Sequence, residues 1–382
     1  MATTRRTPGY WVQRLATVFP AVLVAVFLAG PCLVDQALAA AAPGDLFTVA
    51  DIPVDATANS ALAAREAARV DGQRRAFGVL IERLTLAADR GRVPRLSDQQ
   101  LTELVRDFEV ANERSSAVRY LAAYTFRFRA DDVRRLLADA GVPFAETVSK
   151  PVVVLAVLRH GESALLWDDP NPWRGAWADR QGAAGLVPFI VPLGDAADVA
   201  AIGAEQALAA EPRPLAAIAG HYDGDDILIA VATQLSSGEL KTTLRRVSAS
   251  GTSEIAGAVF QKNPDESEAD FMGRAVTASA AAVQEAWRRG NVLNPGKEEV
   301  LTAEVPLGGI ADWVLVRERL TGVPAIKRSD LVTLGKQGAR VDIHYLGDPT
   351  RLRTALEQRD LVLGGSDGAW SLRPRPGSVP PR

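Results

Sequence analysis

An uninterrupted apolar run, Val152 to Leu158, constrains the fold of this chain more than any other stretch. A strand with one face in water alternates apolar and polar residues, whereas a strand covered on both faces is apolar throughout. The run therefore predicts a buried strand. Further strand and helix patterns follow it, so we expect residues 151–295 to form a central α/β domain, ending in a linker near Pro295.

The segment before this run is expected to form a small α+β domain, residues 44–150. Helical spacing of Phe77, Leu80, Ile81 and Leu84 predicts a helix from about Ser60 to Ala87. Ser97 and Gln100 form a capping-box pattern for a second helix. With Val152–Leu158 as the last strand, the order is βαββαβ, which is the pattern of the ferredoxin-like fold.

The end of the chain repeats this order over residues 298–373. Asp348 followed by Pro349 predicts the start of its second helix, with aspartate as N-cap and proline at the first helical position. The predicted fold class is therefore α+β with α/β: two ferredoxin-like βαββαβ-type domains flank a central α/β domain. The proline-rich residues 374–382 are predicted to form a disordered tail.

The N-terminus has the layout of a secretory signal peptide, residues 1–39. Basic residues precede an apolar run from Leu15 to Gly30, and Ala37-Leu38-Ala39 follows, with further alanines from Ala40. We expect cleavage after Ala39 or within the next three alanines, and hence a periplasmic or secreted protein. A retained membrane anchor is the alternative, but the apolar run falls short of the roughly 20 residues that span a bilayer.

Cys32 is the only cysteine, and it lies inside the predicted signal. Lipidation there is disfavoured because Pro31 stands where a small residue is required. A mature chain without cysteine has no disulfide and no thiolate ligand for a metal. The formal net charge is −3, and the signal is itself basic, so no concentrated basic face is expected. This excludes nucleic acid as a partner, and the uncleaved signal is the expected membrane contact.

Motifs that carry chemistry are missing from the sequence. His160, His221 and His344 fall in different predicted elements, and no pair has zinc-motif spacing. We find neither a phosphate-binding glycine motif nor a G-x-S-x-G nucleophile elbow. The sequence therefore predicts no cofactor, no metal and no catalytic residue. A triad or a carboxylate pair assembled in space stays open as an alternative.

A tryptophan-rich stretch is the best candidate for partner binding. It comprises Trp167, Asp168, Asp169, Trp173 and Trp177. Exposed tryptophans anchor protein partners. However, Asn171 and Pro172 can start a helix, which would place Trp173 and Trp177 four residues apart on one helix face. Packing into the core is then the competing interpretation.

Two stretches carry a family resemblance. They are Leu46–Ala58, which leads into Gly72–Ala76 and Leu84-Thr85, and the terminal Trp370-Ser371-Leu372. Together they resemble domain-of-unknown-function family 2066, a family of exported proteobacterial proteins. The middle segment also resembles the α/β domains of periplasmic assembly factors. These resemblances imply an exported protein of the bacterial envelope and transfer no active site.

These patterns favour one functional hypothesis. Predicted export, small domains in tandem and the missing catalytic motifs favour a non-enzymatic periplasmic binding or assembly module, whose partner is an envelope protein or a glycan. A hydrolase acting on the cell wall or on glycans is the first alternative. A carrier of a small molecule or lipid is the second.

Overall fold

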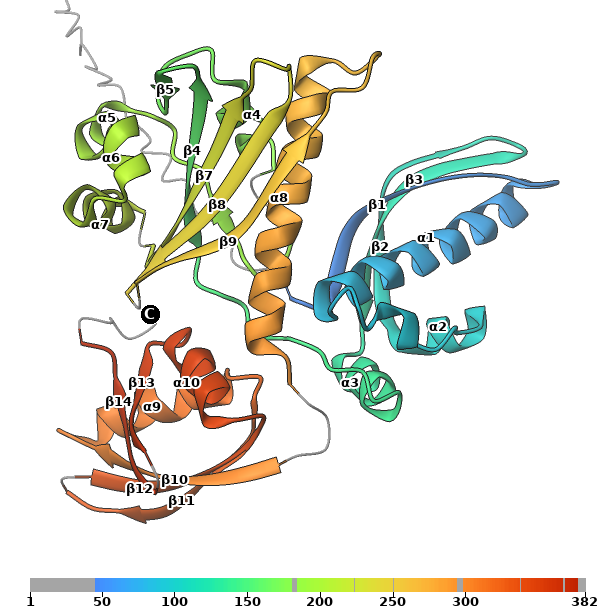
Figure 1. Ribbon diagram of the computed structural model, residues 1–382. Helices are drawn as coiled ribbons and strands as arrows, with labels where there is room; N and C mark the ends of the chain where they lie inside the picture. Colours follow the sequence, from blue (N-terminus) through green and yellow to red (C-terminus); the bar gives the residue numbers. More distant parts are fainter. Residues whose placement is uncertain are drawn as a thin grey trace, which may run out of the picture. The chain divides into compact units, whose positions relative to one another are not determined.

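The computed structural model describes residues 45–180, 184–222, 224–249, 251–293, 298–336, 338–366 and 368–376. Within these residues, ten α-helices and three β-sheets form a mixed α+β fold (Figure 1), as the sequence predicts at this level. The predicted signal peptide with its cleavage site at Ala39 and Ala40, and most of the predicted tail, lie outside the described residues. No helix in the described ranges is long and apolar enough to cross a membrane.

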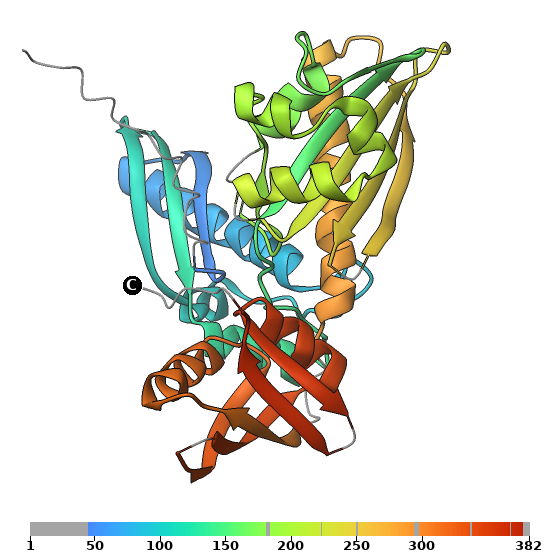
Figure 2. The same cartoon turned by 90° about the vertical axis from the view of Figure 1, so that its left-hand side faces the viewer.

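The first sheet joins three antiparallel strands in the order β1-β3-β2. Helix α1 lies along one face of this sheet, and none of the described helices covers its other face (Figures 1 and 2). The elements of this N-terminal module are β1 (Thr48–Thr57), α1 (Ala61–Leu84), a 3-10 turn (Arg90–Arg92), α2 (Asp98–Leu104), β2 (Val105–Ser115), β3 (Arg119–Phe128) and α3 (Ala130–Asp139).

Local sequence explains why α1 and β3 pack together. The side chain of Ser60 caps α1 by accepting from the backbone N–H of Ala63 at 3.2 Å. The predicted stripe Phe77, Leu80, Ile81 and Leu84 is buried. Alternation in β3 turns its large aromatic residues toward α1, and all of them are buried: Tyr120, Tyr124, Phe126 and Phe128. The capping box of α2 at Ser97 and Gln100 is confirmed.

One sequence prediction for this module is wrong. The apolar run Val152–Leu158 lies in β4, which pairs with β7 in the second sheet and with none of β1–β3. The N-terminal sheet therefore has three strands, not the four of a βαββαβ unit. The reason is burial: side chains from both faces of β4 are buried, and a sheet with helices on one face only cannot bury them both.

The second sheet is a mixed sheet with helices on both faces (Figure 1). Its strand order is β5-β4-β7-β8-β9, and β6 also pairs with β4. Val154 on one face of β4 packs in a core with Trp173, and Val153 on the other face packs in a core with Leu215. The elements are β4 (Val152–His160), β5 (Ser163–Leu165), α4 (Pro172–Ala178), β6 (Phe189–Ile190), α5 (Ala196–Ala201), α6 (Ala204–Ala209), α7 (Pro212–His221), β7 (Asp226–Gln234), β8 (Leu240–Ser248), β9 (Gly251–Phe260) and α8 (Glu268–Asn291).

The third sheet has five strands in the order β11-β12-β10-β14-β13. Asp348 caps α10 by accepting from the backbone N–H groups of Thr350 and Arg351, each at 3.0 Å, as predicted. The final hairpin places β14 beside β10 and parallel to it. The elements of this C-terminal module are β10 (Glu298–Pro306), α9 (Ile310–Thr321), β11 (Ile326–Leu334), β12 (Gly338–Leu346), α10 (Pro349–Glu357), β13 (Leu361–Ser366) and β14 (Ala369–Pro374).

Candidate functional site

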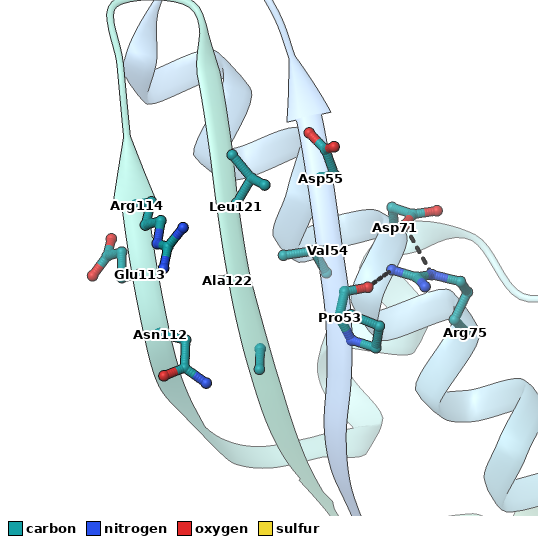
Figure 3. A pocket seen from close by; sticks show the side chains of 11 residues that line it. Pro53, Val54, Asp55, Asp71, Arg75, Asn112, Glu113, Arg114, Leu121 and Ala122 are labelled. Atoms are coloured by element: carbon teal, nitrogen blue, oxygen red, sulfur yellow. Dashed lines mark hydrogen bonds and ion pairs between the residues drawn. The ribbon is translucent and has the colours of Figure 1, made fainter.

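A trough on the open face of the N-terminal sheet is the best candidate site among the described residues. Its volume is about 880 Å³. Residues from all three strands and from α1 line it (Figure 3). The lining residues are Pro53, Val54, Asp55, Asp71, Arg75, Asn112, Glu113, Arg114, Leu121, Ala122 and Ala123. We call this surface the β-trough.

Irregular backbone in both outer strands shapes the β-trough. The pairing of β1 with β3 shifts register between Val49 and Ile52, and Asp51 within that shift has φ of 55°. The pairing of β2 with β3 shifts between Ala111 and Arg114, around Asn112 with φ of 54°. Aspartate and asparagine adopt this left-handed conformation more readily than other side chains do. Such bulges bend a strand and increase its twist, so the outer strands curve away from a flat sheet.

The floor of the β-trough is apolar. Leu121 and Ala123 alternate with the buried aromatic residues of β3 and therefore point to the open face. Pro53 lies opposite Ala123 in the register, and Ala111 lies opposite it on the other side. The small side chain of Ala123 in the middle strand leaves room above the backbone. The sheet therefore presents a hollow instead of a filled layer.

Charged side chains surround this floor, and most of them are paired. Arg119 donates two hydrogen bonds to Asp55, at 2.8 and 2.6 Å. These bonds lower the pKa of the Asp55 carboxyl, which keeps it ionised. Arg75 donates to Asp71 at 2.9 Å. Arg114 is exposed and, in the described part of the chain, makes no side-chain hydrogen bond or ion pair.

The free edge of β1 is closed at the β-trough. The Arg75 guanidinium donates a hydrogen bond to the carbonyl oxygen of Pro53 (Figure 3). Proline has no N–H, so this position offers neither a free donor nor a free acceptor to another strand. The opposite edge, β2, is exposed along almost its whole length. A partner that reaches the β-trough can therefore add hydrogen bonds along β2 and not at Pro53.

The chemistry of the described lining bears on three kinds of site: a general acid, a metal site and a sugar platform. A general acid must be protonated at working pH, whereas Asp55 is held ionised by Arg119. Among the described residues, no group of three or more histidine, cysteine, aspartate or glutamate side chains could hold a metal ion. The lining also includes no aromatic ring on which a sugar could stack.

The tryptophan stretch lies mainly in the core of the central module. Trp173 and Trp177 are fully buried, and Trp173 donates to the carbonyl oxygen of Ala230 at 2.9 Å. Trp167 is half-buried and donates to Ile202 at 2.7 Å, while Asp168 and Asp169 are exposed. Two of the three tryptophans therefore cannot touch a partner of the folded protein. This supports packing over partner binding.

The three histidines have separate surroundings. His160 at the end of β4 lies 3.0 Å from the side-chain oxygen of Gln234. His344 in β12 lies between Glu298 at 3.0 Å and Asp330 at 3.2 Å. His221 ends α7, with its ring nitrogen 3.7 Å from Asp198. Among the described residues, none of these histidine contacts forms a Ser–His–Asp arrangement.

A buried carboxylate that the sequence did not single out lies beside His221. Asp198 is fully buried and accepts from the Tyr222 hydroxyl at 2.8 Å and from the backbone N–H of Gly194 at 2.9 Å. Burial and this carboxylate raise the pKa of Tyr222. Asp198 sits in a short helix of small residues, which gives no sequence signal that sets it apart from an exposed aspartate.

Comparisons with known protein families, curated proteins and solved structures found no match. The resemblance to domain-of-unknown-function family 2066 therefore stays a prediction.

Proposed function

We propose that this chain is an exported protein of the bacterial envelope that binds another envelope protein, and that the β-trough is its binding surface. The observation that carries the proposal is the hollow of about 880 Å³ on a sheet face that no described helix covers. A bare sheet face with an apolar floor and a charged border has the anatomy of a protein interface, with an apolar centre and a polar rim.

The openness of the β-trough favours a polypeptide over a small molecule. Small-molecule sites enclose most of the surface of their ligand, whereas this hollow is bordered by two strand edges and one side of α1. The carrier alternative is therefore less well supported. Asp55 does not supply the hydrolase alternative with a protonated acid, because Arg119 pairs with it and lowers the pKa of its carboxyl. A glycan partner lacks an aromatic platform in the lining.

We also propose that the C-terminal module is a ferredoxin-like unit with one added strand. Its elements follow the order β10, α9, β11, β12, α10, and β12 lies between β10 and β11. These features support the proposal. The parallel pairing of β14 with β10 departs from the simple pattern, because β13 is inserted before β14 as an outer strand.

Site-specific photo-crosslinking in intact cells tests the binding surface. A photoreactive residue at position 121 should give one defined adduct with an envelope protein. Ala123→Arg should abolish the adduct, because it places a long charged side chain on the apolar floor. Thr125→Arg is the matched control, since Thr125 is the next residue of β3 on the same face and lies outside the lining.

Two results would contradict the binding proposal. One is an adduct from position 121 that Ala123→Arg does not reduce, provided that Ala123→Arg and Thr125→Arg keep the thermal stability of the parent. The other is equal labelling from position 193, where Leu193 is exposed on the central module. Export is tested separately by cell fractionation and N-terminal sequencing. A mature chain that begins between Ala40 and Pro43 supports export. A cytoplasmic protein whose N-terminus is still uncleaved contradicts it.

A further inference from the structure

Large apolar side chains are exposed on α9 and β11 of the C-terminal module. Two belong to α9 and three to β11, and between 45% and 66% of each residue is exposed. The members are Ile310, Val314, Leu331, Val332 and Leu334. We call them the β11 patch. Single exposed apolar residues need no explanation, but a group of this kind marks an interaction surface.

Topology brings the α9 and β11 members together. β10 and β11 are both antiparallel to β12, so they run in the same direction. Helix α9 connects them and runs back, so its first turn lies near the end of β11. Leu331 lies opposite Val341 and Leu334 opposite Ala339, and both partners are buried. Leu331 and Leu334 therefore point to the face of the sheet that α9 covers.

Among the described strands, β11 is also an unpaired sheet edge. It is the outermost strand of the order β11-β12-β10-β14-β13, and eight of its nine residues are exposed. An edge strand presents a row of free N–H and C=O groups, which natural proteins usually cover or interrupt. An added strand satisfies these groups and buries the apolar side chains beside them. A lipid surface would bury the side chains and leave the backbone groups unpaired.

The charges around the β11 patch define the partner further. Lys327, Lys336 and Arg317 are exposed, and none forms an ion pair with another described residue. Among the acidic side chains of α9, Glu318 is exposed and forms no ion pair with another described residue. Asp330 is engaged by His344 at 3.2 Å and by Arg328 at 3.3 Å. The free charge at this surface is therefore positive, which favours an acidic partner.

A second copy of this chain does not fit the same charge pattern. Lys327 lies near the start of β11 and Lys336 just beyond its end. Antiparallel self-pairing brings the start of one strand beside the end of the other. Lys327 of each copy would then approach Lys336 of the other, and like charges side by side are destabilising.

We propose that β11 and the β11 patch bind an extended segment of a partner polypeptide in which apolar and acidic residues alternate. The segment adds to the sheet as a sixth strand, its apolar residues cover Leu331 and Leu334, and its carboxylates face Lys327 and Lys336. This surface lies on the C-terminal module and does not depend on the β-trough.

Hydrogen–deuterium exchange on the full mature chain tests this proposal. The probe is a nine-residue peptide of alternating glutamate and valine, compared with one of alternating lysine and valine, each at millimolar concentration. The acidic peptide should slow exchange of the β11 amides, and the basic peptide should not. Lys327→Glu combined with Lys336→Glu should weaken binding of the acidic peptide by about tenfold.

A pair of aspartate variants separates the patch from edge strands in general. Leu331→Asp with Leu334→Asp should abolish the protection, whereas Val259→Asp on the outermost strand β9 should preserve it; Val259 is 56% exposed. Equal protection by both peptides, or by neither, overturns the proposal. A dimer in analytical ultracentrifugation that the combined Leu331→Asp and Leu334→Asp variant disperses also overturns it. Cosedimentation with phosphatidylglycerol vesicles, lost in the same variant while the peptide gives no protection, would assign a lipid surface instead.

Discussion

Trp173 and Trp177 pack edge to face in the core of the central module, with ring centroids 6.0 Å apart and ring planes at 87°. They are four residues apart on α4, so both side chains lie on the same face of the helix. Phe189 continues the contact, with its ring 5.4 Å from that of Trp177. The short helix is therefore fastened to the sheet by its two largest side chains.

Trp173→Ala should unfold the central module at much lower denaturant than the parent. Removing a fully buried tryptophan costs about 3–5 kcal/mol, and the carbonyl of Ala230 also loses its donor. Urea denaturation followed by circular dichroism measures the loss. Leu193→Ala is the control, because Leu193 is 62% exposed and should change stability little. A loss below 1 kcal/mol for Trp173→Ala would contradict the burial described above.

Two glycines of α1 should respond in opposite ways to alanine. A Cβ at Gly72 would lie 2.9 Å from Val54 and 3.3 Å from Phe126, because the helix approaches the sheet closely there. Gly72→Ala should therefore destabilise the protein by about 1–3 kcal/mol. A Cβ at Gly78 meets nothing within 4 Å, so Gly78→Ala should stabilise it by about 0.5–1 kcal/mol. Thermal denaturation of the two variants, measured side by side, is the test.

Glu266 should contribute stability that acid removes. Arg274, at 2.7 and 2.8 Å, and then the backbone N–H of Asn263 lower the pKa of Glu266 from 4.5 to about 2. A pKa that is lower in the folded state stabilises the protein above the unfolded value of 4.5, and the effect disappears as pH falls from there toward 2. Glu266→Gln should thus be less stable than the parent at neutral pH and equal to it at the acid end. A constant difference across this range would disprove the linkage.

Tyr222→Phe should destabilise the central module through Asp198. The variant removes the hydroxyl that donates to Asp198 at 2.8 Å, and the buried carboxylate keeps the donor of Gly194 at 2.9 Å. Loss of one partner of a buried acceptor costs about 1–3 kcal/mol. A double-mutant cycle with Asp198→Asn measures the contact by urea denaturation. Strictly additive effects of the two substitutions would show that the contact contributes nothing.

Local patterns predicted most helices and strands because the forces that set them act over a few residues. The stripe of α1, the capping box at Ser97 and the start of α10 at Asp348 are all properties of adjacent turns. The sheet to which a strand belongs depends on residues far away in the sequence. The apolar run of β4 predicts burial on both faces, but the partner that provides the burial, β7, lies about seventy residues along the chain, at Asp226–Gln234. The sequence alone could not select that partner.

The β-trough escaped prediction for a related reason. Its shape depends on left-handed backbone at Asp51 and Asn112, and each of these residues looks like an ordinary polar residue in an alternating strand. Asparagine within a strand is the signal that could have located the second bulge. The tryptophan stretch is the opposite case. Three tryptophans close together in the sequence suggest a binding surface, whereas Trp173 and Trp177 lie four residues apart on α4 and pack into the core.

The hydrogen bond from Arg75 to the Pro53 carbonyl affects the tendency of this protein to aggregate while it folds. Newly synthesised chains can pair with one another through unpaired strand edges, and such pairing starts ordered aggregates. Pro53 has no N–H to donate to an incoming strand, and its carbonyl oxygen already accepts from Arg75. A second chain therefore cannot extend the sheet by pairing at this position. The same pair that borders the β-trough thus guards the N-terminal module against aggregation from the β1 side.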